Sequence, residues 1–138
     1  LPLRMEKHLA NAKEIASWLE DHAAVERVTY AGLDSSPYKD RVAKICPKGA
    51  GALFTVSLKG GYEACTKFVE SLKLFSHVAN LGDARSLVIH PASTTHRQLT
   101  PEQQIAAGAA PDTVRLSIGI EGVEDLKADL DQALKAAG

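Results

Sequence analysis

Hydrophobic and polar positions alternate in one short stretch near the end of the chain. Val114, Leu116 and Ile118 are apolar, whereas Arg115 and Ser117 between them are polar. A period of two residues is typical of a strand that buries one face and leaves the other open. We therefore predict a strand over Val114–Ile118 that carries a guanidinium on the face opposite the core.

Arg115 has two interpretations at this position. An arginine on the solvent face of a one-sided sheet needs no partner. Alternatively, its planar and permanently charged fork suits a carboxylate or a phosphate held by two hydrogen bonds. The spacing alone does not decide between a solvated side chain and an anion-binding one.

Longer periodicities predict the remaining elements. Helical periods predict helices over 3–21, 62–74 and 123–136, with shorter helices over 38–45 and 100–108. Strand-like segments cover 25–30, 52–58, 78–80 and 86–90. Both faces of the segment 52–58 are largely apolar, which indicates a central strand covered on both sides. Thr100, Pro101 and Gln103 are typical of a capped helix start.

These elements predict an α+β fold. Several connections between strands are too short for parallel crossovers, which favours antiparallel pairing. We expect a mostly antiparallel sheet with helices packed on one face, in a single domain that spans residues 1–138. The open face of this sheet would carry Arg115 and Ser117.

Composition narrows the classes of partner. The chain has 138 residues, 16 basic and 17 acidic, and a formal net charge of −1. This balance argues against a nucleic acid or an anionic membrane as partner. No apolar stretch approaches the length of a membrane span. Cys46 and Cys65 match no metal or redox spacing, so we interpret them as free thiols, with a disulfide as the alternative.

Several segments of the second half resemble one enzyme family. In chain order they are Asn80–Arg97, Ala106–Gly108, Val114–Glu121 and Glu124–Leu126. Together they resemble the C-terminal domain of the Cys/Met-metabolism enzymes that depend on pyridoxal phosphate. Within this family the run Ser93-Thr94-Thr95-His96 is most similar to O-acetylhomoserine sulfhydrylases, with Thr94 where other branches usually carry Met. Cystathionine γ-synthases and γ-lyases are the main alternatives. Gly122 departs from the family, in which an acidic residue is common there.

The resemblance implies a site and a reaction. Arg115 would anchor the α-carboxylate of an amino-acid substrate, with Asn80 and its neighbouring backbone assisting. The reaction would be a γ-replacement, in which sulfide or a thiol displaces acetate to give homocysteine or methionine. Lys67 lies in a sequence that superficially resembles the family's Schiff-base site, but it falls on the polar side of a helix. We therefore expect no catalytic and no cofactor-binding residue in this chain.

The remaining expectations concern the whole protein. The first helix has neither an initiator methionine nor a capping side chain, which suggests a fragment of a longer enzyme. The resemblance implies that a larger N-terminal domain holds pyridoxal phosphate and its lysine, and that the full-length enzyme is a cytoplasmic homotetramer in methionine biosynthesis. An alternative of another class is a stand-alone amino-acid-binding or protein-docking module that uses Arg115 as a clamp.

Other polar residues have simpler interpretations. His90 and His96 match no zinc spacing and have no evident third ligand, so we expect no metal site. Ser93, Thr94 and Thr95 most simply satisfy backbone groups of their own loop.

Overall fold

A five-stranded sheet lies at the centre of the computed structural model, which describes every residue from Leu1 to Gly138. Its strands are β1 (Val25–Thr29), β2 (Leu53–Leu58), β3 (Ser76–His77), β4 (Leu87–Ile89) and β5 (Thr113–Ser117). They lie in the order β1-β2-β5-β4-β3, and every neighbouring pair is antiparallel except β3 and β4. The predicted mostly antiparallel sheet is confirmed.

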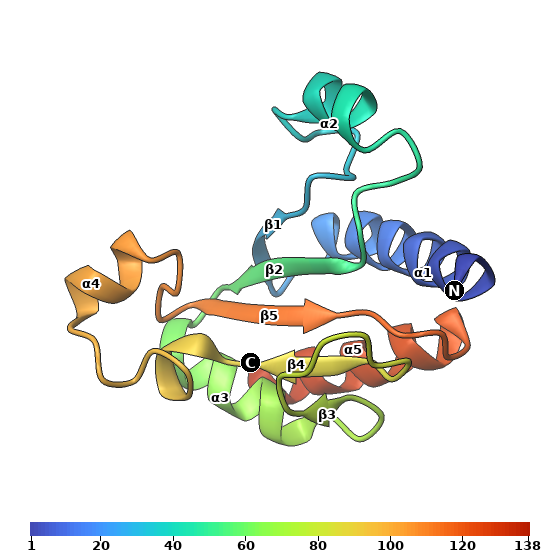
Figure 1. Cartoon of the computed structure of the whole chain (residues 1–138). Coiled ribbons are helices and arrows are strands. Elements are labelled where there is room, and N and C mark those ends of the chain that lie inside the picture. The colour runs from blue at the N-terminus through green and yellow to red at the C-terminus, as the bar shows by residue number, and fades with distance from the viewer.

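The chain also forms five α-helices (Figure 1). They are α1 (Pro2–Glu20), α2 (Lys39–Ile45), α3 (Gly61–Ser71), α4 (Pro101–Ala106) and α5 (Val123–Ala137), with a 3-10 turn at Pro91–Ser93. The three long helices pack on one face of the sheet, whereas α2 and α4 stand away from it as two arms. The α+β class with helices on one face is therefore confirmed. No helix is long and apolar enough to cross a membrane.

The hydrophobic core fills the space between the sheet and the three long helices. Val114 and Leu116 of β5 join it from the sheet, and Ile15 and Leu130 join it from α1 and α5. The predicted alternation of β5 is confirmed, because these two apolar side chains are fully buried while Arg115 between them is only half-buried. One side of the same strand thus anchors the core, and the other faces away from it.

The prediction that both faces of β2 are covered is wrong. Phe54, Val56 and Leu58 point into the core, but Leu53 on the opposite face is 44% exposed. Because the three long helices share one side, the other side of the sheet lacks a helical layer. The open face is therefore wider than the sequence pattern suggested.

The boundaries of two elements differ most clearly from the prediction. The predicted strand over 78–80 is irregular, and the strand that pairs with β4 is the preceding segment, Ser76–His77. Helix α3 ends at Ser71 and not at Leu74, because the buried carboxylate of Asp129 on α5 accepts hydrogen bonds from the next backbone amides. Those donors are the N–H groups of Lys73, Leu74 and Phe75.

Candidate functional site

Arg115 lies in the middle of the open face. In the sheet register it sits between Thr55 of β2 and Ile89 of β4. Its side chain is half-buried, and no ion pair or side-chain hydrogen bond within the chain engages its guanidinium. An arginine fork that is partly shielded from water and has no partner of its own is suited to bind an anion from outside.

Asn80 and Arg115 line the same small hollow. Its other lining residues come from the segment after β3 and from strands β4 and β5: Val78, Ala79, Leu87, Val88, Ile89 and Ser117. The two residues singled out in the sequence are therefore brought together, although they lie 35 positions apart along the chain. Their role in substrate binding stays a prediction.

The side-chain amide of Asn80 is occupied within its own loop. Its Oδ1 accepts a hydrogen bond from the backbone N–H of Leu81 at 2.9 Å, and its Nδ2 donates to Oδ2 of Asp83 at 3.3 Å. Asn80 lies outside the helices and strands, and its backbone N–H donates to no backbone carbonyl. The second Nδ2 hydrogen of Asn80 and its backbone N–H both remain available to an anion beside Arg115, because a side-chain amide has two N–H donors.

A charged pair organises this loop. Asp83 Oδ1 accepts hydrogen bonds from the backbone N–H of Arg85 at 3.0 Å and from Arg85 Nε at 3.1 Å. Its Oδ2 accepts from Arg85 Nη2 at 2.9 Å. These hydrogen bonds and the one from Asn80 hold the pKa of Asp83 far below its ordinary value, because they stabilise the ionised carboxylate. The loop is thus built around a carboxylate that stays charged.

Glu121 anchors the end of the same loop to the end of β5. One carboxylate oxygen accepts from the backbone N–H of Ser86 at 2.7 Å and the other from its hydroxyl at 2.9 Å. The Ser86 oxygen in turn accepts from the N–H of Gly119 at 2.8 Å. A Cβ at Gly119 would lie 2.4 Å from the Ala84 carbonyl oxygen, so only glycine permits this close approach. Ser86 therefore has a structural role.

His90 is a structural residue of the loop between β4 and β5. The ring of buried His90 is hydrogen-bonded on both sides, to Ser93 Oγ at 2.9 Å and to the Pro111 carbonyl at 2.8 Å, which closes the excursion between β4 and β5. Thr94 Oγ1 and Ser93 Oγ donate to the His90 carbonyl at 2.7 and 3.3 Å, so these hydroxyls satisfy a backbone group as predicted. For Thr95 the prediction is wrong, because its Oγ1 pairs with the side chain of His96 at 2.8 Å. No group of three or more His, Cys, Asp or Glu side chains is placed to hold a metal ion.

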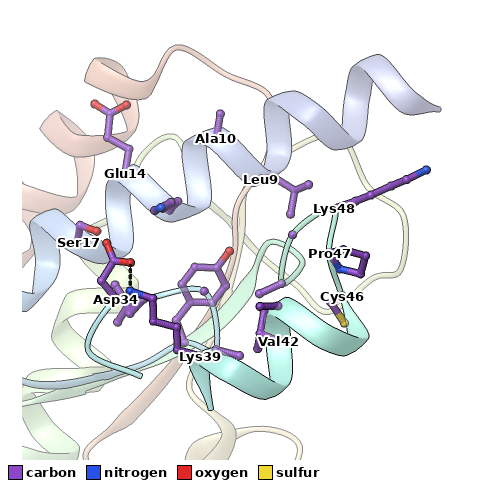
Figure 2. A pocket seen from close by; sticks show the side chains of 18 residues that line it. Leu9, Ala10, Glu14, Ser17, Asp34, Lys39, Val42, Cys46, Pro47 and Lys48 are labelled. Carbon is purple, nitrogen blue, oxygen red and sulfur yellow. Dashed lines mark ion pairs between the residues drawn. The ribbon is translucent and has the colours of Figure 1, made fainter. Parts of the chain in front are cut away.

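A larger hollow lies elsewhere, between α1 and the α2 arm (Figure 2). Its volume is about 670 Å³, and its walls include Leu9 from α1 and Val42 from α2. Lys39 on its rim is paired with Asp34 at 3.0 Å. This hollow shares no residue with the one around Arg115 and contains neither of the predicted site residues.

The lysines of the chain do not fit covalent attachment of pyridoxal phosphate. None of them is buried, and Lys67 is exposed on the outer side of α3, as predicted. Lys127, which is partly buried, is committed to ion pairs with Glu14 at 2.7 Å and Glu124 at 3.2 Å. An attachment lysine needs a shielded site that lowers its pKa.

The sequence did not single out Asp83, Arg85 or Glu121 as parts of one site. A signal was present, since an Asn, a Gly and an Asp cluster within four positions before a basic residue, which is typical of a turn held by side chains. The partnership between Ser86 and Glu121 spans 35 positions and leaves no local trace.

Comparisons with known proteins relate this chain to one enzyme family. The family profile of Cys/Met metabolism PLP-dependent enzymes matches residues 1–135. An O-acetyl-L-homoserine sulfhydrylase from Thermus thermophilus is 53% identical over 134 residues, and an L-methionine gamma-lyase from Treponema denticola is 46% identical over 134 residues. Each match covers 97% of this chain, but only 32% of the Thermus protein and 33% of the Treponema protein.

A solved structure supports the same placement. A crystal structure of a Campylobacter jejuni protein described as an O-acetylhomoserine (thiol)-lyase superposes with a TM-score of 0.89 at 41% identity, covering 97% of this chain and 32% of that one. Its lysine bearing a pyridoxyl monophosphate lies outside the aligned region. The chain thus spans about a third of the length of these relatives and corresponds to their C-terminal part. It belongs to the family of Cys/Met-metabolism PLP-dependent enzymes.

Proposed function

We propose that this chain binds the α-carboxylate of the amino-acid substrate in an O-acetylhomoserine sulfhydrylase, with Arg115 as the principal contact. The observation that supports this role is a half-buried guanidinium without an internal partner, facing a hollow that it shares with Asn80. The full-length enzyme would replace the acetate of O-acetylhomoserine with sulfide or a thiol, giving homocysteine or methionine.

The chemistry of the ligand fits the chemistry of the clamp. A carboxylate and a guanidinium both keep their charge throughout the neutral pH range, and they can meet through two parallel hydrogen bonds. Such a pair fixes orientation as well as position. Orientation matters because pyridoxal phosphate, when bound, draws electrons from bonds at the α-carbon. Arg115 would hold the substrate at its acid end, and the reacting carbons would lie beyond the open face.

The rest of the protein belongs to the proposal too. Residues 1–138 would form one domain at the C-terminal end of a longer enzyme, whose N-terminal domain holds pyridoxal phosphate on its lysine and covers the open face. A homotetramer in the cytoplasm, acting in methionine biosynthesis, remains our prediction for assembly, compartment and pathway.

Steady-state kinetics of the full-length enzyme test this role. We expect Arg115→Ala to raise the KM for O-acetylhomoserine by roughly 30- to 5,000-fold, because loss of one partner from a shielded charge pair costs about 2–5 kcal/mol. Arg115→Lys should also be damaging, because a point charge cannot replace the planar fork. The absorbance of bound pyridoxal phosphate should not change. An unaltered KM in both variants would contradict the proposal.

A γ-lyase is the second candidate, because methionine gamma-lyases are among the relatives at 46% and 45% identity. The two activities differ in what they require. A sulfhydrylase consumes sulfide or a thiol and keeps the amino group on its product, whereas a γ-lyase releases ammonia without any acceptor. Ammonia release from O-acetylhomoserine or methionine, measured with and without sulfide, separates the two.

A further inference from the structure

The connection between β3 and β4 is unusually short for its topology. The two strands are parallel, with Ser76 opposite Leu87 and His77 opposite Val88. Parallel neighbours ordinarily need a crossover of about a dozen residues or more, yet here only residues 78–86 join them. This crossover has no helix or strand of its own, so side chains must fix its path.

The crossover passes beside Arg115. Val78, Ala79 and Asn80 line the hollow that also exposes Arg115 and Ser117. The shape of that hollow therefore depends on how the crossover is held. Leu81 at its far end is almost fully exposed, and Gly82 beside it has a positive φ of 72°.

Asp83 is where the restraints on the crossover converge. Its carboxylate takes two hydrogen bonds from the side chain of Arg85, one from the backbone of Arg85 and one from Asn80. The two paired side chains differ in solvent exposure: that of Asp83 is 12% exposed and that of Arg85 is 65% exposed. A second tie comes from α1, where Arg4 Nη2 donates to the Gly82 carbonyl at 2.8 Å.

We propose that Asp83 is a positioning residue for the substrate-carboxylate site, acting through Asn80 to hold the crossover 78–86 against Arg115. Asp83 itself touches no substrate. It joins the two ends of the tight turn, because Asn80 on one side and Arg85 on the other both donate to it. This inference rests on the proposed role of Arg115, and it gives the side chain of Asn80 a part in holding the crossover.

The electrostatics of the pair predict a specific effect on kinetics. The Asp83–Arg85 pair lies at the surface, where ion pairs contribute little to global stability. The same contacts restrict a loop that lines a binding site, and a misplacement of about 1 Å in such a group can cost up to 100-fold in rate. Loss of the pair should therefore alter substrate capture far more than folding.

Variants of the full-length enzyme test the proposal. Asp83→Asn keeps the size of the side chain and removes its charge, and Arg85→Gln removes the same pair from its exposed partner. We expect either change to raise the KM for O-acetylhomoserine by roughly tenfold, with the KM for sulfide unchanged. The melting temperature should move by no more than about 1 °C. Arg85→Lys should have an intermediate effect, because it keeps the charge and loses the fork.

Asp34→Asn is the matched control. It also neutralises an aspartate paired with a basic side chain, Lys39 at 3.0 Å, but on the α2 arm and away from the hollow around Arg115. We expect the KM of Asp34→Asn for O-acetylhomoserine to equal that of the unmodified enzyme. An equal KM in Asp83→Asn, Arg85→Gln and Asp34→Asn would overturn the inference. So would a parallel rise in the KM for both substrates with a lower melting temperature, which would indicate a purely structural role.

The outcome separates this inference from the proposed function. If Arg115→Ala leaves the KM for O-acetylhomoserine unchanged, the carboxylate clamp is wrong and Asp83 has no site to position. If Arg115→Ala raises that KM and neither Asp83→Asn nor Arg85→Gln does, only the positioning role of Asp83 is wrong. Because Arg85 is largely exposed, its variant remains informative even if Asp83→Asn fails to fold.

Discussion

The two faces of β5 differ in burial and in the contacts that their side chains make. On one face Val114 and Leu116 are sealed beneath the three long helices, where burial of apolar surface stabilises the fold. On the other face Arg115 keeps its guanidinium free of internal partners and stands beside a loop whose turn is held by hydrogen bonds to Asp83. Neighbouring positions of one strand can therefore be tested separately for stability and for binding.

The largest expected effect is on stability at the covered face. Leu116 is 1% exposed, and Leu116→Ala should lower the free energy of unfolding by about 2–5 kcal/mol, through lost burial and the cavity left behind. Arg115→Ala, one position away, should lower it by less than about 1 kcal/mol. Urea unfolding of the 138-residue chain, followed by fluorescence of Trp18, measures both. If both variants lost the same unfolding free energy, the proposed difference between the two faces would be wrong.

The two cysteines extend the comparison to reactivity. Cys65 lies in the covered core, where burial and, to a smaller extent, the charge of Asp112 raise its thiol pKa from 9.0 to about 12. Three pKa units correspond to roughly a thousandfold smaller thiolate fraction. Cys46 is exposed after α2. We expect a thiol reagent to modify one cysteine rapidly in the folded chain and both after unfolding.

Cys46→Ser provides the control for the thiol measurement. This variant should show no rapidly reacting thiol in the folded state and one after denaturation. Two rapidly reacting thiols in the unmodified chain would contradict the burial of Cys65. A disulfide between Cys46 and Cys65 would contradict the free thiols that the structure shows.

A smaller effect concerns pH. Burial lowers the pKa of His90 below its ordinary 6.5, with a lesser contribution from His77, while the hydrogen bond to the Pro111 carbonyl partly opposes the shift. The unfolded chain therefore binds this proton at a higher pH than the folded chain does. Stability from this group is complete above pH 6.5 and declines as the pH falls from there towards the folded pKa.

Urea unfolding at a series of pH values between about 5 and 8 tests this prediction. His90→Gln should reduce the slope of the unfolding free energy against pH, and His96→Gln is the matched control for removing one histidine. An identical slope in the unmodified chain and in His90→Gln would show that His90 does not carry the dependence.

Local patterns were sufficient for the elements whose causes are local. The strand around Arg115 follows from alternation over five residues, and the start of α4 follows from a capping box, in which Thr100 and Gln103 exchange hydrogen bonds. The free cysteines and the exposed Lys67 were likewise predicted from the residues around them.

The failures have non-local causes. Helix α3 ends early because Asp129 lies 56 positions beyond Lys73 and captures its amide. No short window of sequence contains both residues.

The site was predictable in part for the same reason. A charge in mid-strand drew attention to Arg115, because an arginine among alternating apolar residues has few explanations. The meeting of Asn80 with Arg115 depends on the order β5-β4-β3, which no local pattern encodes. The sequence did not single out the network of Asp83 and Arg85, since a turn and a turn that positions a ligand contact use the same residue types.

Inhibition by paired ligands tests the role of Arg115 most directly. Norvaline and butylamine share an amine and an alkyl chain, and only norvaline has a carboxylate. In the full-length enzyme, Arg115→Ala should weaken inhibition by norvaline by roughly 30-fold or more, the equivalent of at least about 2 kcal/mol, and leave inhibition by butylamine unchanged. Equal weakening of both ligands, or of neither, would contradict a carboxylate contact at Arg115.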